Sequence, residues 1–110
     1  VIQACANGGF IRGMEWALDE MRSRDIPPNE WTFGALLSGC RTSDEEDAFA
    51  KAEEFLELLL TVDIRLSGSF ILNNLVELCR KHRQRERLFF WAPKLVSLGA
   101  QPDEKVKKQL

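Results

Sequence analysis

The apolar residues of this chain recur with the spacing of one helix face, and that spacing is itself repeated along the sequence. Five sets of four residues occupy positions i, i+3, i+4 and i+7, which place their side chains on a single helical stripe. The sets are Met14, Ala17, Leu18 and Met21; Phe33, Leu36, Leu37 and Cys40; Ala52, Phe55, Leu56 and Leu59; Leu72, Leu75, Val76 and Cys79; and Leu88, Trp91, Ala92 and Leu95. The pattern predicts a series of amphipathic helices and no strands.

A recurring offset relates these helices in pairs. The separation of Cys5 from Cys40 is close to that of Cys40 from Cys79, and Pro28 and Pro102 are separated by the sum of the two. Self-similarity at a period within roughly 20–50 residues indicates a repeated unit, here of two helices. We divide the chain into a truncated first repeat at 1–30, a second repeat with an insertion at 31–69, a third repeat at 70–104, and the start of a further helix at 105–110. The predicted fold is all-α, a single array forming an α-solenoid of antiparallel helical hairpins.

Local signals mark the predicted helix ends. Asn29 follows a Pro-Pro pair and is expected to cap the next helix. Ser43 stands three residues before Glu46, a capping-box spacing that predicts the start of the following helix. Pro93 falls inside a helical stripe and is expected to kink it. The segment 66–69 lacks the proline found at the other two inter-repeat turns, so we expect that joint to be looser.

Composition excludes several classes of function. The 110 residues include 45% hydrophobic and 29% charged residues, which is typical of folded protein, and 15 basic against 17 acidic residues give a net charge of −2. No apolar run approaches the ~20 residues of a membrane span, so no membrane partner is expected. Three distant cysteines and the single His82 favour neither a disulfide framework nor a metal site. We expect no cofactor, no small-molecule substrate and no enzymatic activity. Because Val1 is not methionine, we expect the chain to begin inside a longer protein.

Taken as a set, these features resemble the pentatricopeptide repeat (PPR) family. The residues that carry the resemblance are Gly8-Gly9 between the two helices, Met21 late in the second helix, and the turns Pro28-Asn29 and Pro102-Asp103. The related tetratricopeptide repeat is less similar, because its Trp-x-x-Leu-Gly-x-x-Tyr signature is missing and the chain has no tyrosine. The resemblance covers essentially the whole chain and implies a right-handed superhelix.

The resemblance also implies a function. PPR proteins mostly bind single-stranded RNA along the face formed by the first helix of each repeat, one base per repeat. They act in mitochondrial or chloroplast RNA processing, stability or translation, so one of these two organelles is the expected location. Carrying over the second, fifth and last repeat positions gives the expected base-facing residues Thr32, Ala35, Ser69, Ile71, Asn74, Glu104 and Val106. Ala35 cannot hydrogen-bond a base, and Glu104 repels phosphate, so backbone-led contact is favoured over base-by-base reading.

A basic run at residues 80–87 is the candidate phosphate contact. Arg80, Lys81, His82 and Arg83 lie at the end of one predicted helix and in the following turn. Cations there can neutralise RNA phosphates, or they can simply favour the C-terminal end of the helix as a solvated turn. Arg85 and Arg87 are expected to pair with acidic neighbours or to face solvent. The opposite run, at residues 44–47, is typical of a helix N-terminus.

The aromatic residues leave a second class of function open. Trp91 is expected in the core, Trp31 in packing against the preceding repeat, and Trp16 on an exposed or inter-repeat surface. Phe89 and Phe90 make the last long helix apolar nearly all round, which suggests burial by another repeat or by a protein partner. The alternatives to RNA binding are therefore a protein-interaction scaffold, or the substrate-binding part of a larger RNA-processing enzyme.

Overall fold

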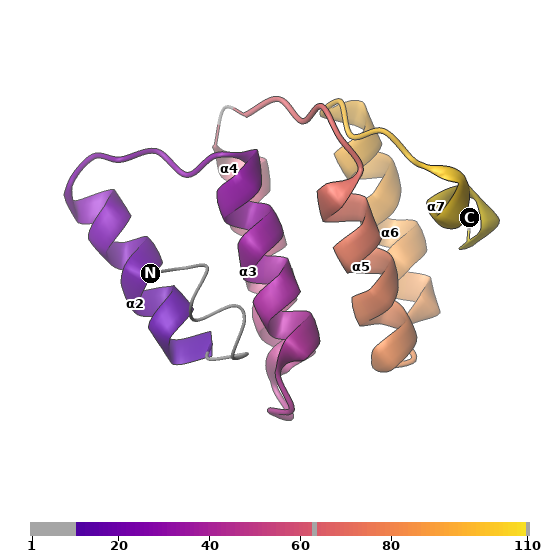
Figure 1. The fold of residues 1–110 in the computed structure, drawn as a ribbon, viewed down its shortest axis with the longest axis horizontal. Coiled ribbons are helices and arrows are strands. Elements are labelled where there is room, and N and C mark those ends of the chain that lie inside the picture. Colours follow the sequence, from indigo (N-terminus) through magenta and orange to yellow (C-terminus); the bar gives the residue numbers. More distant parts are fainter. Residues whose placement is uncertain (1–10, 63, 110) are drawn as a thin grey trace.

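The fold is built from helices joined by short connections. A computed structural model describes residues 11–62 and 64–109 (Figure 1). Within those ranges no strand occurs, and the helices are α2 (Ile11–Ser23), α3 (Glu30–Thr42), α4 (Ala48–Thr61), α5 (Phe70–Lys81), α6 (Arg85–Ser97) and α7 (Glu104–Gln109). This confirms the predicted all-α class. The helix expected around Cys5 and the Gly8-Gly9 turn lie outside the described residues.

The helices pack as neighbouring hairpins in two layers. In Figure 1, α3 and α5 stand side by side, with α4 behind α3 and α6 behind α5. The hairpin partners α3 and α4 are in contact, as are α5 and α6, while α3 also contacts α2 and α5, and α5 contacts α7. The α3–α4 and α5–α6 turns lie at one end of the molecule, and the connections between hairpins lie at the other (Figure 1).

The five predicted stripes form the core. Every stripe residue is buried except Met21, which is partly buried against the same cluster. Burial of one stripe per helix is what drives packing here, because isolated helices of this length are marginal in water. Trp91 is 2% exposed, which confirms its predicted place in the core. No helix of the described part is long and apolar enough to cross a membrane.

Similar side-chain caps start α3 and α7. The Asn29 side chain accepts a hydrogen bond from the Thr32 backbone N–H at 2.9 Å, and the Thr32 hydroxyl accepts one from the Asn29 N–H at 3.3 Å. At the equivalent position of the third repeat, the Asp103 carboxylate accepts from the Val106 N–H at 2.9 Å. These bonds satisfy N–H groups that lack an intrahelical partner. The predicted cap at Asn29 is confirmed.

Ser43 has a different place from the one predicted. It is the C-cap of α3, with its backbone N–H donating to the Gly39 carbonyl and its hydroxyl accepting from the Glu45 N–H at 3.1 Å. Residues 44–47 then form the connection, and α4 begins at Ala48 with Asp47 as its N-cap residue. The capping-box prediction was wrong because the extra residues of this repeat lengthen the turn before the helix starts.

Two further expectations concern backbone interruptions. Helix α6 continues through Pro93, which is exposed and has no backbone N–H to donate to the Phe89 carbonyl. Hydrogen bonds hold the connection at 66–69 to both neighbouring inter-helix connections. We had expected this connection to be less well held than the other two inter-repeat turns. The Leu66 N–H donates to the Leu98 carbonyl at 2.9 Å, the Gln101 N–H donates to the Gly68 carbonyl at 3.0 Å, and the Glu30 carboxylate accepts from the N–H groups of Ser67 and Gly68.

Ion pairs join α2 to α4 and α4 to α6. Glu15 of α2 pairs with Lys51 of α4 at 3.5 Å, and Glu53 of α4 pairs with Arg87 of α6 at 2.6 Å. Glu15 and Glu53 each follow the first apolar residue of their stripe, whereas Lys51 and Arg87 each precede it. The two junctions therefore use the same positions of the repeat, and the second adds a hydrogen bond from the Trp91 indole N–H to Glu53 at 2.8 Å.

Candidate functional site

The turn between α5 and α6 brings three arginine residues to the lining of one cavity. Because α5 ends at Lys81 and α6 begins at Arg85, only three residues connect two antiparallel helices. Arg83 turns the backbone with a positive φ of 55°. The result is a cavity of about 380 Å³ lined by Arg80, Arg83, Arg85, Cys79 and Leu88. We call the three arginines the arginine cluster.

The arginine cluster is only partly neutralised by its surroundings. Arg80 pairs with Glu77 at 3.5 Å, and the Arg85 guanidinium lies 5.7 Å from the Phe89 ring centroid. Among the described residues, neither Arg83 nor Arg85 has a carboxylate partner. A planar guanidinium presents paired N–H donors that match the oxygens of a phosphate. The cluster therefore has the chemistry of an oxyanion-binding surface.

Lys81 and His82 are not part of this cavity. The Lys81 ammonium donates to the backbone carbonyls of Arg41 and Ser43, both at 2.7 Å, and so ties the C-terminal end of α3 to α5. The His82 ring lies 5.6 Å from the Phe49 ring. Desolvation, and then the charge of Lys81, lower the pKa of His82, which favours its neutral form. Of the four predicted phosphate contacts, the structure brings Arg80 and Arg83 together.

Arg85 is the cluster residue that the sequence analysis assigned elsewhere. It was expected to pair with an acidic neighbour or to face solvent, as its neighbour Arg87 does pair, with Glu53. Arg85 instead begins α6 and lines the same cavity as Arg80 and Arg83. The sequence shows that Arg85 belongs to a basic run. Which cavity its side chain lines depends on the conformation of the turn between α5 and α6.

The predicted base-facing residues are mostly buried. Thr32, Ala35, Ile71, Asn74 and Val106 are each 4% exposed or less. The Thr32 hydroxyl belongs to the cap of α3, and the Asn74 amide donates to the carbonyls of Gly34 and Phe70, at 3.4 and 3.1 Å. In this structure their side chains pack the front-layer helices together rather than lining an open surface.

Ser69 and Glu104 are the two members of that set that reach the surface. Ser69 is partly buried just before α5, and its hydroxyl accepts from the Asn73 side-chain amide at 3.3 Å. Glu104 is exposed in the first turn of α7, where a carboxylate favours the helix N-terminus. Neither residue lies in the arginine cluster.

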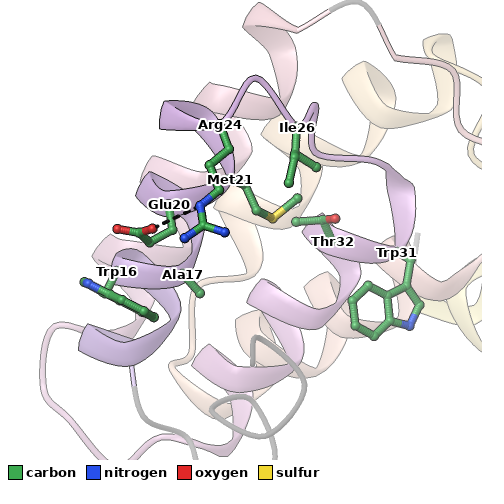
Figure 2. Close-up of a pocket in the computed structure, with 8 residues that line it drawn as sticks. All are labelled: Trp16, Ala17, Glu20, Met21, Arg24, Ile26, Trp31 and Thr32. Carbon is green, nitrogen blue, oxygen red and sulfur yellow. Dashed lines mark ion pairs between the residues drawn. The ribbon is translucent and has the colours of Figure 1, made fainter.

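Aromatic side chains stand on the surface beside the buried positions. Trp31 is 51% exposed at the start of α3, and Phe70 is 46% exposed at the start of α5. Trp31 was expected to pack against the preceding repeat, and it is half exposed. Instead it borders an open groove of about 430 Å³ between α2 and α3, together with Trp16, Met21 and Ile26 (Figure 2). An ion pair of 3.5 Å between Arg24 and Glu20 lies at the same groove.

Phe89 and Phe90 have different neighbours in the structure. Phe90 is 45% exposed and lies near two cations, with the Arg87 guanidinium 4.4 Å and the Lys94 ammonium 4.7 Å from its ring centroid, and it meets Trp91 edge to face. Phe89 instead lines an apolar groove of about 560 Å³ with Pro93, Val96 and Pro102. The Phe89 side of α6 therefore borders an apolar groove, and Phe90 lies beside two cations.

The two cysteine thiols of the described residues are expected to be unreactive. Burial, and then the charge of Glu53, raise the pKa of Cys79 to about 12, although Arg87 opposes the shift. Burial, and then the charge of Glu15, raise the pKa of Cys40 to about 12. A protonated buried thiol is a poor nucleophile. Within the described ranges no group of three histidine, cysteine or carboxylate side chains is placed to hold a metal ion.

Comparisons with known proteins give no further guide. No protein-family model matches the chain, and no curated protein and no solved structure matches it. A function for this chain therefore has to be argued from its own side chains.

Proposed function

We propose that this chain is a PPR-like array of helical hairpins that binds single-stranded RNA. The observation that carries the proposal is the arginine cluster, in which Arg80, Arg83 and Arg85 surround one cavity and only Arg80 has a carboxylate partner among the described residues. RNA backbone phosphates are a ligand whose oxygens match the N–H donors of such a cluster.

The proposed array is an α-solenoid with a right-handed superhelical twist. Its support is the recurrence of the same contact at equivalent repeat positions. Asn29 and Asp103 cap their helices alike, and the rear-layer ion pairs Glu15–Lys51 and Glu53–Arg87 join neighbouring hairpins alike. Contacts restricted to neighbouring units, repeated in register, are the property that defines a solenoid.

In this proposal, recognition is led by the RNA backbone. The second and fifth repeat positions are buried, so they offer no polar surface to base edges. Phosphate contacts confer affinity and position but little sequence information. The proposed setting is RNA processing, stability or translation in the mitochondrion or chloroplast, either as a binding protein or as the RNA-binding part of a larger enzyme.

The test is a salt-dependent titration of the whole chain with a labelled oligouridylate. Three phosphate contacts predict that the logarithm of the binding constant falls with the logarithm of salt concentration with a slope of about −2. Arg83→Gln and Arg85→Gln should each weaken binding at low salt and reduce the magnitude of the slope by about 0.7. Arg22→Gln, an exposed arginine of α2 far from the turn, is the matched control and should change neither. Absence of binding at low salt, or an unchanged slope in both cluster variants, would refute the proposal.

A second candidate is protein contact through α6. Phe89, Pro93 and Val96 form an apolar stripe that α6 leaves uncovered. The residues at the equivalent positions of the first repeat, Glu15, Asp19 and Arg22, form the stripe by which α2 faces α4. The α6 stripe therefore occupies an inter-helix contact position. Under this reading a partner pull-down is insensitive to RNase and to Arg83→Gln but is lost in Phe89→Glu.

A further inference from the structure

We propose that copies of this chain associate head to tail, with α6 of one copy packed on α2 of the next. Two surfaces take part. The α6 end face consists of Phe89, Ala92, Pro93 and Val96, which line one groove. The α2 end face consists of Gly13 with Trp16, Ala17 and Glu20, of which the last three line another groove. This association needs no RNA, and it names a second copy as the occupant of the groove beside Phe89.

The two end faces correspond to the two sides of a junction inside the molecule. Where α2 meets α4, a cavity of about 230 Å³ is lined from α2 by Glu15, Leu18, Asp19 and Arg22, and from α4 by Glu54, Phe55 and Leu58. We count positions from the first apolar residue of each stripe, which is Met14, Ala52 or Leu88. The α2 lining then corresponds to the α6 end face, and the α4 lining corresponds to Trp16, Ala17 and Glu20 of the α2 end face. A second copy can therefore continue the rear layer in the register that the molecule already uses.

The charged pair of the internal junctions is replaced on both end faces together. At each internal junction a carboxylate, Glu15 or Glu53, pairs with a cation of the next rear helix. On α6 the carboxylate position is Phe89, and on α2 the cation position is Gly13. An internal face placed on either end face would bury a charge without its partner, which is costly. The two end faces thus match each other and do not match the internal faces.

A phenylalanine ring against a helix glycine is a contact that this fold already contains. The Phe70 ring of α5 occupies the space that a β-carbon at Gly34 of α3 would need. Gly13 is partly exposed on α2, so the Phe89 ring of a second copy can approach the α2 backbone in the same way. Trp16 is 59% exposed and lies three residues after Gly13, on the same side of the helix. Contact between copies would cover both aromatic rings.

The front-layer positions of two such copies do not overlap. Helix α7 corresponds in the repeat to residues 30–35, the first half of α3. The stripe residues Val1, Ile2 and Cys5 lie outside the described residues, and in sequence they correspond to positions 36–40. The α7 of one copy and the first residues of the next therefore occupy successive positions of one front-layer unit.

This contact has two consequences that can be measured. Each copy has one α6 end face and one α2 end face, so the association is heterologous and extends beyond two copies unless a ring closes. The contact contains no ion pair at the Phe89 and Gly13 positions. Salt screens charges but not apolar contacts, so self-association should persist at a salt concentration that releases RNA from the arginine cluster.

The experiment is sedimentation equilibrium of the whole chain without nucleic acid, at about 0.1 M and about 1 M sodium chloride. We expect the average mass to rise with protein concentration to a similar extent at both salt concentrations. Phe89→Glu and Gly13→Lys should each weaken self-association by about tenfold or more, because each puts an unpaired charge into the contact. Gln84→Glu, at an exposed position of the α5–α6 turn, is the matched charge control and should change nothing. Circular dichroism checks the fold of each variant.

Combining the two substitutions tests the pairing of the faces. A chain that carries both Phe89→Glu and Gly13→Lys regains the charged pair of the internal junctions, so it should associate again and now more weakly at high salt. An equimolar mixture of the two single variants should also associate. The proposal is overturned if the unmodified chain stays monomeric, if the double variant does not recover, or if Gly13→Lys has no effect while Phe89→Glu abolishes association. The last result would instead indicate a two-fold contact between α6 helices. None of these results bears on RNA binding by the arginine cluster, which the titration tests separately.

Discussion

Glu53 joins the two hairpins of the rear layer, and replacing it gives a quantitative test of how they are held together. One carboxylate oxygen of Glu53 accepts from the Arg87 guanidinium at 2.6 Å and from the Trp91 indole N–H at 2.8 Å. Glu53→Ala removes both bonds. Trp91 is 2% exposed, so its N–H would be left buried without an acceptor.

The expected loss follows from these two terms. An unsatisfied buried donor costs about 1–3 kcal/mol. The ion pair adds no more than about 1 kcal/mol, because the Arg87 and Glu53 side chains are 39% and 24% exposed and solvent screens them. We therefore expect Glu53→Ala to lower the free energy of unfolding by about 2–3 kcal/mol. For a chain of this length, that corresponds to a fall in Tm of about 10 °C.

The assay is thermal and urea denaturation followed by circular dichroism, with the repeat itself supplying the control. Glu15 occupies the equivalent position on α2 and pairs with Lys51 at 3.5 Å, without a buried indole. Glu15→Ala should cost less than about 1 kcal/mol. Glu53→Gln keeps a neutral acceptor for Trp91 and should recover most of the loss. If Glu53→Ala were no more destabilising than Glu15→Ala, the buried hydrogen bond would not contribute as argued.

Two further predictions concern the connections and the thiols. Gly99 has a φ of 112° and its missing β-carbon would overlap the Leu66 carbonyl, so Gly99→Ala should cost about 2 kcal/mol or more in urea denaturation. Gly68→Ala, whose β-carbon would come no closer than 3.9 Å to another group, should cost under about 1 kcal/mol. In Cys5→Ser protein, the raised pKa of Cys40 and Cys79 predicts thiols that react with Ellman's reagent only after unfolding. Because both folded-state pKa values lie above 9.0, the stability they contribute is complete below about pH 9 and should be lost as pH rises from about 9 to about 12, seen as a falling urea midpoint.

The sequence predicted the helices because their signal is local. A stripe such as Leu72, Leu75, Val76 and Cys79 specifies both the helix and its buried face, since helical geometry alone puts those side chains together. The cap at Asn29 was equally predictable, because its partner Thr32 is three residues away. Ser43 is a case in which a local signal gave the wrong prediction. A capping-box spacing is necessary for that cap, but it does not determine at which residue the helix begins when the preceding turn is longer.

The candidate site was predicted less completely, because it depends on where side chains are directed after packing. The basic run was visible in sequence, yet Lys81 is bonded to the end of α3 and Arg85 joins the cavity. The positions carried over from the family resemblance fell on Ile71 and Asn74, which the packing of α3 against α5 buries. Exposure on a helix depends on which neighbour covers it, and periodicity does not name that neighbour.

The sequence by itself determined the helical class and the place of Cys40 and Cys79 in the core, because each follows from spacing along one chain. Tertiary structure alone decided that Glu30 ties down the 66–69 connection and that Phe70 lies across Gly34. Those contacts join residues of different repeats, far apart in the chain. Their geometry depends on how one hairpin sits against the next, and that is settled by the packing of whole stripes.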